Sequence, residues 1–195
     1  MTGRQAREQW IGAVAGLGNP GRLYEKTRHN AGYQVLDLLA ADCSVFMQER
    51  KFKAEWGFGS VEGRKVLFMK PLAFMNKSGG PVGEILAYFG IPESQLLVIH
   101  DDLDLSLGRL RLVRRGGAGG HRGVLSLIEH LRGQNFPRLK LGIGRPAHGE
   151  PVEEYVLQAP SGEEAKVFQE MIAQGANVAK AVLVHGLDHA MNAFN

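Results

Sequence analysis

Hydrophobic positions along the chain fall into short unbroken runs and into longer stretches that repeat every three or four residues. The short runs are typical of strands buried on both faces, and the periodic stretches are typical of amphipathic helices. The runs predict strands at residues 11–17, 54–61, 64–70, 96–100, 109–113 and 139–143. The periodic stretches predict helices at 31–42, 78–89, 121–131 and 162–185, with a short helix at the end of the chain.

Turn and capping residues set several of these boundaries. Glu62-Gly63 predicts a tight turn between two hairpin strands, and Gly90 predicts the end of the second helix. Ser161 and Glu164 match a capping box, a pattern that opens many helices. Strands that alternate with helices predict an α/β fold, with a twisted, mixed but mostly parallel sheet and helices on both faces. We therefore expect a three-layer sandwich and, since no repeat or linker interrupts the pattern, a single domain over residues 1–195.

The composition fits a globular domain that acts in a reducing compartment. Of the 195 residues, 44% are hydrophobic, which is enough to bury a core without cross-links. The one cysteine, Cys43, has no partner for a disulfide and lies in a helical pattern, so we expect it in the core. The sequence has no signal-peptide pattern and no run of about 18 apolar residues, so we expect neither secretion nor a membrane span. We expect a cytoplasmic monomer.

Charge is distributed unevenly along the chain. The net charge is +3, yet residues 109–145 hold nine Lys and Arg against one acid, Glu129. A basic segment of this kind raises the local concentration of anions and suits a polyanionic partner. A solvated basic face with no partner is the other interpretation of the same pattern.

Two glycine-rich segments partly match phosphate-binding loops. Residues 16–21 fit G-x-G-x-x-G, but Pro20-Gly21 indicates a turn and the next helix starts only at Ala31, so we expect no dinucleotide cofactor. Residues 116–120 lack the Lys-Ser or Lys-Thr of a nucleotide triphosphate loop. One interpretation is that their backbone N–H groups bind a phosphate. The other is that the segment is only a flexible connection. The basic side chains beside it are Arg114, Arg115 and Arg122.

Polar residues follow three predicted strands that are far apart in the sequence: Asn19, His29, Asn76 and Asp101. Because the carboxyl ends of parallel strands share one edge of a sheet, we expect these side chains to converge there. A histidine with a carboxylate partner is a general base that can activate water, and asparagines can hold the water or donate to an oxyanion. Since no serine or cysteine stands in a nucleophile motif, direct attack by water is the simplest mechanism.

Metal binding is the competing interpretation of this region. The possible ligands are His29, His100, Asp101, Asp102, Asp104 and His121. The aspartate-rich run lacks the glycine and the distal glutamate of an EF-hand, and no H-E-x-x-H pattern occurs. We expect no required metal and keep a metal-assisted peptidase or esterase as a weaker alternative.

Motifs spread along the chain occur in a specific order. They begin with the loop at 16–21, Tyr24, and Thr-Arg-His-Asn at 27–30. The later blocks are Phe-Met-Asn-Lys-Ser-Gly at 74–79, His-Asp-Asp-Leu-Asp-Leu at 100–105, Gly-Gly-His-Arg-Gly at 119–123 and Arg-Leu-Lys-Leu-Gly-Ile-Gly at 138–144. In this order they resemble the bacterial peptidyl-tRNA hydrolase family. The resemblance covers about residues 11–195, and residues 1–9 form an N-terminal extension beyond the usual start.

The resemblance implies hydrolysis of the ester that joins a peptide to the 3′ ribose of tRNA, which recycles the tRNA. It implies no metal or organic cofactor, and we expect no DNA or membrane partner. It makes His29 the general base, Asp101 the residue that orients it, and Asn19 and Asn76 the groups that position substrate and water. The residues implied on the peptide side are Tyr24, Phe74 and Met75. Those expected to bind phosphates of the acceptor stem and 3′ end are Arg111, Arg114, Arg115 and Lys140.

Two positions depart from the family pattern. Arg122 stands where the family often has Asn, so an amide that donates and accepts is replaced by a cation that only donates, and we expect it to contact a phosphate or carbonyl of the substrate. Val113 stands where a basic residue is common, and Arg114 or Arg115 is expected to compensate. A chain can keep catalytic residues while its partner surface changes. An RNA-binding protein without hydrolysis, like a plastid splicing-factor branch of the family, is therefore the alternative function.

Overall fold

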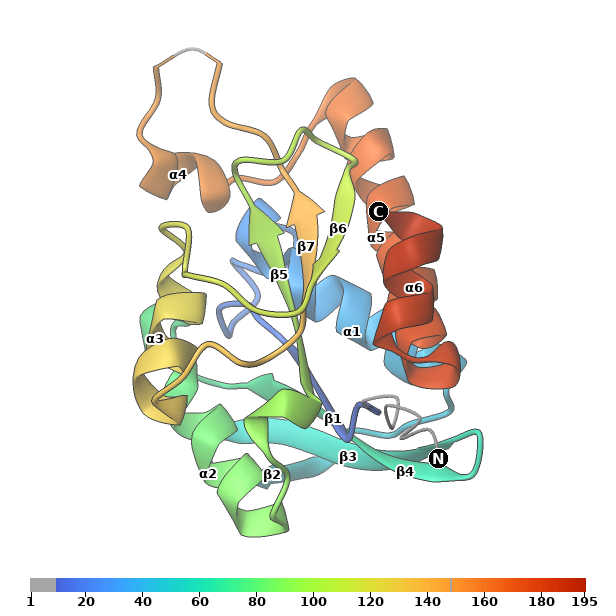
Figure 1. Cartoon of the computed structure of the whole chain (residues 1–195). Helices are drawn as coiled ribbons and strands as arrows, with labels where there is room; N and C mark the ends of the chain where they lie inside the picture. The colour runs from blue at the N-terminus through green and yellow to red at the C-terminus, as the bar shows by residue number, and fades with distance from the viewer. Residues whose placement is uncertain (1–9, 148) are drawn as a thin grey trace.

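The computed structural model describes residues 10–147 and 149–195, which form one seven-stranded sheet with helices on both faces (Figure 1). The strands are β1 (Ala13–Gly16), β2 (Glu49–Lys51), β3 (Ala54–Val61), β4 (Arg64–Pro71), β5 (Leu96–Asp102), β6 (Leu110–Val113) and β7 (Arg138–Gly142). The helices are α1 (Ala31–Asp42), α2 (Gly79–Phe89), α3 (Arg122–Leu131), α4 (Val152–Val156), α5 (Gly162–His185) and α6 (Leu187–Phe194). Three short 3-10 turns are η1 (Arg28–Asn30), η2 (Met75–Lys77) and η3 (Glu93–Gln95). The expected extension at residues 1–9 lies outside the described residues.

The sheet has a parallel centre and antiparallel edges. Its strand order is β2-β3-β4-β1-β5-β7-β6. Strand β1 pairs in parallel with β4 and β5, and β5 pairs in parallel with β7, whereas β2, β3 and β6 are joined by antiparallel ladders. The predicted mixed sheet is confirmed, with the parallel arrangement confined to the four central strands.

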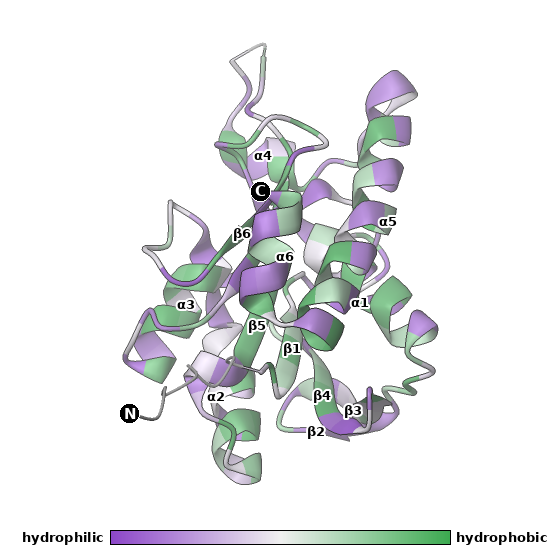
Figure 2. Ribbon diagram, turned by 45° about the vertical axis from the view of Figure 1, so that its right-hand side comes forward, coloured by the Kyte–Doolittle hydropathy of each residue, from purple (hydrophilic) through white to green (hydrophobic). Residues whose placement is uncertain are grey.

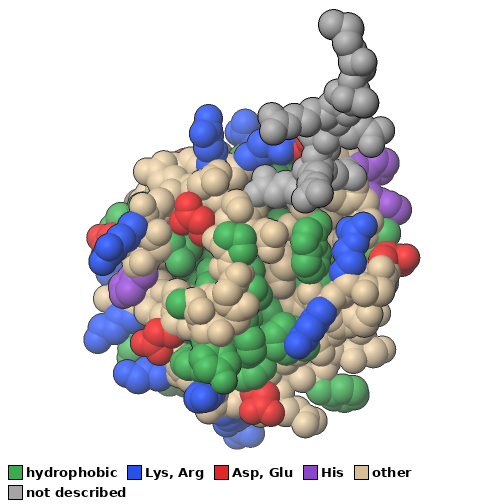
Figure 3. Space-filling model, turned by 60° about the horizontal axis from the view of Figure 1, so that its bottom comes forward, with side chains coloured by type: hydrophobic (Ala, Val, Ile, Leu, Met, Phe, Trp, Pro, Cys, Tyr) green, Lys and Arg blue, Asp and Glu red, His purple; other side chains and the backbone are tan. Residues whose placement is uncertain are grey.

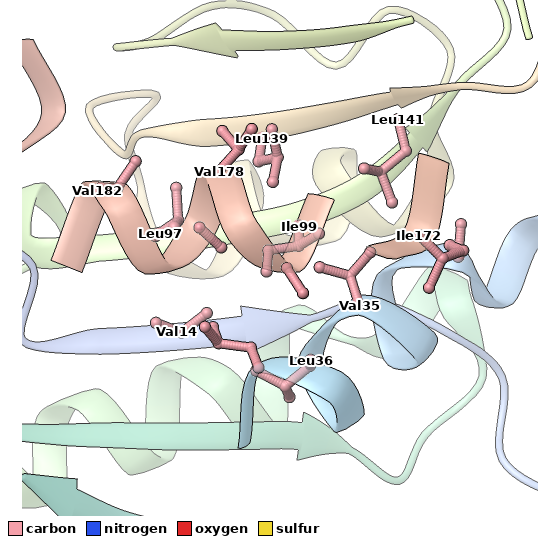
Figure 4. Packing of buried hydrophobic residues seen from close by; sticks show 14 of the residues in the cluster. Val14, Val35, Leu36, Leu97, Ile99, Leu139, Leu141, Ile172, Val178 and Val182 are labelled. Carbon is pink, nitrogen blue, oxygen red and sulfur yellow. The ribbon is translucent and has the colours of Figure 1, made fainter. Parts of the chain in front are cut away.

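Two hydrophobic layers cover the two faces of this sheet. Alternate residues of the central strands point to opposite faces, so Val14 packs toward α1 and α5 while Ala13 and Ala15 pack toward α2 and α3. The layer beneath α5 contains Ile99 and Leu139, shown in close contact with the helix in Figure 4. Figure 2 shows β1 and β5 as hydrophobic strands, as expected for strands covered on both sides. The predicted three-layer sandwich is therefore confirmed.

Some boundaries differ from the predictions. Strand β5 runs two residues further than expected, because Asp101 and Asp102 pair in register with β7. Strand β2 and helix α4 were not predicted, since three and five residues are too few to carry a periodic pattern. The capping box was also wrong: Ser161 is the N-cap of α5 but makes no side-chain cap, and Glu164 pairs with a distant arginine instead. Cys43 is half-buried at the C-terminal end of α1, at the margin of the core.

An aromatic cluster lies at the β2–β3 edge of the sheet, beside α2. The Phe89 ring is 4.9 Å from the Phe58 ring and 5.2 Å from the Trp56 ring, measured between centroids. Tyr88 and Phe52 extend the cluster outward, with centroids 5.1 Å apart. Figure 3, which looks at the bottom of Figure 1, shows hydrophobic side chains gathered on this face.

Within the described part of the chain, none of the helices has the length and apolar character needed to cross a membrane.

Candidate active site

A cleft lies at the carboxyl end of the sheet, beside the last residues of β5. Its walls come from segments that are far apart in the sequence: the loop after β1, η1, η2, the turn before α3, and α4. The four polar residues expected to converge, Asn19, His29, Asn76 and Asp101, all line this cleft. That part of the sequence prediction is confirmed.

His29 and Asp101 form a hydrogen-bonded pair in the cleft. The Nδ1 atom of His29 lies 2.9 and 3.0 Å from the two carboxylate oxygens of Asp101, whose side chain is only 2% exposed. Burial on its own would lower the pKa of His29, but the charge and hydrogen bond of Asp101 outweigh burial, so the pKa is raised. Nearby Arg122 acts in the lowering direction. Because Nδ1–H donates to Asp101, the Nε2 atom is left as the proton acceptor.

A second histidine binds the same carboxylate. His121 Nε2 lies 2.9 Å from an Asp101 oxygen, and its Nδ1 accepts the backbone N–H of Val124 at 3.2 Å, as the N-cap of α3. The Val124 contact makes Nδ1 an acceptor, so the proton must sit on Nε2 and point at Asp101. Burial would raise the pKa of Asp101, but both histidines act against burial and hold the pKa well below its usual range. Sequence reasoning considered His121 only as a metal ligand and missed this contact.

Asn19 is buried and fixed by three hydrogen bonds. Its side-chain oxygen accepts the backbone N–H of Met75 at 2.8 Å. Its backbone N–H and carbonyl bond the side-chain amide of Asn30, at 2.9 and 3.0 Å. Since the side-chain oxygen is occupied, the amide nitrogen of Asn19 is the end that can donate to a substrate. Asn30 was not predicted to act here, although it stands next to His29 in the same motif.

The residues expected on the peptide side lie on and around η2. Met75 is buried, and Asn76 is exposed at the cleft surface. Phe74 is 58% exposed, with its ring centroid 6.4 Å from that of Tyr24 and the two rings perpendicular. Tyr24 contacts the cleft through Phe74 and is not itself among the lining residues. An exposed aromatic pair beside a polar cleft is suited to packing against an apolar chain.

Arg122 lies at the rim of the cleft. Its guanidinium nitrogen is 3.2 Å from the Glu153 carboxylate of α4, and both side chains are about two-thirds exposed. The ion pair therefore spans the opening between the start of α3 and α4, where solvent screens it.

The basic residues expected to bind phosphate lie on β6 and β7 and just after β6, and none of them lines the cleft. Arg111 and Lys140 are register partners on adjacent strands. Arg111 is exposed, whereas the Lys140 ammonium is held by Asp102 at 2.6 Å. Arg114 forms an ion pair with Asp188 of α6, and Arg115 is exposed. Lys140 thus links the basic edge to the residue that follows Asp101 in β5.

The residues considered as metal ligands are mostly engaged by other partners. The ligand atoms of His29, Asp101 and His121 lie within 4.8 Å of one another and are the ones that could hold a cation. Each of these atoms already takes part in the N–H···O contacts described above. His100 is fully buried, its Nδ1 lies 2.7 Å from the Asp101 carbonyl, and burial keeps its pKa well below the usual value. Asp104 pairs with Arg145 at the surface. The donor set fits a hydrogen-bonded carboxylate between two imidazoles.

The family model described as peptidyl-tRNA hydrolase matches residues 13–195. The chain belongs to the peptidyl-tRNA hydrolase family. A peptidyl-tRNA hydrolase from Carboxydothermus hydrogenoformans is 47% identical over 182 residues, covering 93% of this chain and 97% of the relative. One from Bacillus subtilis is 43% identical with the same coverage of both chains. The crystal structure of peptidyl-tRNA hydrolase from Acinetobacter baumannii superposes with a TM-score of 0.90 at 34% identity, covering 97% of each chain.

Proposed function

We propose that this member of the family hydrolyses the ester between the peptide and the 3′ ribose of peptidyl-tRNA, with His29 as the general base. The single observation that carries the proposal is the His29–Asp101 pair in the cleft, with N···O distances of 2.9 and 3.0 Å. A carboxylate in this position fixes the histidine tautomer and stabilises the imidazolium that forms when water is deprotonated.

In the proposed reaction, His29 Nε2 takes a proton from a water molecule while the water oxygen attacks the ester carbonyl. The tetrahedral intermediate then collapses, the bond to the ribose 3′ oxygen breaks, and the imidazolium returns the proton to that oxygen. The products are a peptide with a free carboxylate and a tRNA with a free 3′ hydroxyl. Asn19 and Asn76 line the cleft beside His29, and their amide N–H groups are suited to holding the water and the developing oxyanion.

The two ends of the substrate are assigned to opposite sides of the cleft. The peptide is proposed to pack on Phe74, Met75 and the neighbouring Tyr24, because these are the apolar side chains at η2. The acceptor stem and 3′ end are proposed to lie along the β6–β7 edge. The residues proposed to bind its phosphates there are Arg111, Arg114, Arg115 and Lys140. Such contacts to phosphates carry no base-specific information, so all tRNAs are expected to be substrates.

The departure at Arg122 fits a contact at the edge of the substrate. Its cation lies at the rim, paired with Glu153, and is proposed to bind a phosphate or carbonyl that arrives there. We further propose that the protein works as a monomer in the cytoplasm, without metal or organic cofactor, in the recycling of tRNA. A lone unpaired cysteine supports a reducing compartment.

The direct test is cleavage of peptidyl-tRNA by the parent protein and by His29→Ala. Loss of proton transfer is expected to lower kcat by at least about 10²-fold. The matched control is His189→Ala, which removes an exposed histidine on α6 and is expected to keep parent activity. Near-normal cleavage by His29→Ala would remove His29 from the mechanism.

Two further outcomes distinguish the alternatives. Tight tRNA binding by the parent protein without ester cleavage would favour the RNA-binding, splicing-factor-like alternative. We expect full activity after exhaustive treatment with a chelator, and a loss that added metal restores would instead favour a metal-assisted hydrolase.

A further inference from the structure

Arg28, the residue directly before His29, is a buried arginine whose partners come from a distant part of the chain. Its side chain is 5% exposed, although arginine is almost never buried without a partner. One guanidinium nitrogen lies 2.7 Å from the Glu164 carboxylate at the start of α5. The other lies 3.3 Å from the carbonyl of Gln158. The guanidinium stacks over the Tyr155 ring, 4.2 Å from its centroid.

These contacts gather at the C-terminal end of α4. The backbone N–H of Arg28 also donates to the Gln158 carbonyl, at 3.0 Å, so side chain and main chain meet at one acceptor. The last carbonyls of a helix have no partner within it, and a cation placed there satisfies them and the helix dipole. A helix of five residues such as α4 is not stable alone. Arg28 therefore helps to hold α4 in place, together with the burial of Tyr155 and Val156 in the core and the Tyr155 hydroxyl, which donates to the Ile143 carbonyl at 2.6 Å.

Helix α4 forms one wall of the cleft. Val152, Glu153 and Val156 of this helix line the cleft, as does Leu157 just after it. His29 follows Arg28 directly in the 3-10 turn η1. One side chain thus links the position of the wall to the position of the proposed base.

We propose that Arg28 is a positioning residue, which fixes the α4 wall relative to His29 by bridging Glu164, Tyr155 and Gln158. The inference rests on the proposed hydrolysis, since it assigns Arg28 a part in that reaction. Arg28 does not line the cleft and acts through the residues on either side of it.

The chemistry of the contact explains why an arginine stands here. A planar guanidinium can stack on a ring and donate along two directions at once, whereas an ammonium acts as a point charge. Arg28→Lys keeps the charge but loses the planar group that donates in two directions. Arg28→Met keeps much of the apolar part of the side chain and loses the charge. Glu164→Gln weakens the ion pair from the other side. Glu163→Gln is the matched control, because Glu163 is an exposed neighbour in the first turn of α5 that pairs only with Lys166 among the described residues.

The experiment measures kcat and KM for peptidyl-tRNA at a temperature where thermal unfolding shows each variant more than about 95% folded. Arg28→Met is expected to raise KM about tenfold, Arg28→Lys and Glu164→Gln about threefold, and Glu163→Gln less than twofold. A role in stability alone would leave kcat and KM per folded molecule unchanged. Values within twofold of the parent for well-folded Arg28→Met would overturn the proposal.

Hydrogen exchange of residues 152–158 separates this proposal from the proposed function. Arg28→Met is expected to speed exchange in that segment at least tenfold, and Glu163→Gln to leave it unchanged. Faster exchange in a protein whose parent cleaves no peptidyl-tRNA would mean that the contact holds α4 but that the proposed function fails, and with it the role of Arg28 in hydrolysis. Unchanged exchange would overturn the bridge itself, whatever the activity.

Discussion

The cleft and the aromatic cluster are held together by different physical interactions. In the cleft, buried polar groups are held by directional hydrogen bonds: Asp101 binds both His29 and His121, and Asn19 binds Met75. At the β2–β3 edge of the sheet, Trp56 and its aromatic neighbours meet through ring contacts. Ring contacts tolerate small shifts, whereas a buried polar group that loses its partner costs about 1–3 kcal/mol. Changes in the cleft should therefore alter the rate of hydrolysis, and changes in the aromatic cluster should alter stability.

The largest expected effect is the loss of rate in Asp101→Asn. Both histidines contact the same oxygen of Asp101, and His29 also contacts the second oxygen at 3.0 Å. Asparagine loses the negative charge that stabilises the His29 imidazolium, and its amide nitrogen cannot accept at the second position. Peptidyl-tRNA cleavage should fall by at least about 10²-fold in kcat. Steady-state kinetics on a variant with parent-like circular dichroism measures this, and a loss below about threefold would contradict the contrast between the cleft and the aromatic cluster.

A loss of stability with little change in rate is expected for Trp56→Ala in the aromatic cluster. Truncation of the half-buried ring should lower the free energy of unfolding by about 2 kcal/mol, less than for a fully buried ring. Chemical denaturation measures the loss, and kcat and KM of the folded variant should stay within twofold of the parent. A large fall in kcat without a loss of stability would show that the aromatic cluster and the cleft are coupled.

How far the sequence predicted the molecule also differs between core and site. The α1 helix and the β3 strand were predicted to the residue, because hydrophobic spacing and turn residues are local signals. The convergence of His29 and Asp101 followed from the rule that strand ends share an edge, and their roles stay predictions. The contact of Arg28 with Glu164, 136 residues away, leaves no trace in local spacing.

Smaller effects are expected along the basic edge. If the proposed phosphate contacts exist, Arg111→Glu and Lys140→Gln should each reduce the slope of log affinity against log salt by about one unit for tRNA binding, because each removes one such contact. The matched control is Lys65→Gln on β4, whose ammonium lies over the Phe58 ring of the aromatic cluster. Binding titrations at several salt concentrations measure the slopes. Equal slopes for all three variants and the parent would mean that tRNA does not bind at β6–β7.

The most direct test of the central claim, that Asp101 and His29 act as one unit, is the pH dependence of kcat/KM in the parent and in Asp101→Asn. His29 must be neutral to take a proton, so activity rises with pH through its pKa. In the parent, Asp101 raises that pKa against the effect of burial. Asp101→Asn removes the charge and leaves burial, so the rising limb should move to lower pH while the plateau falls. If kcat/KM rose through the same pH range in both proteins, the account would be contradicted, because the titrating group would then not be a histidine whose pKa Asp101 raises.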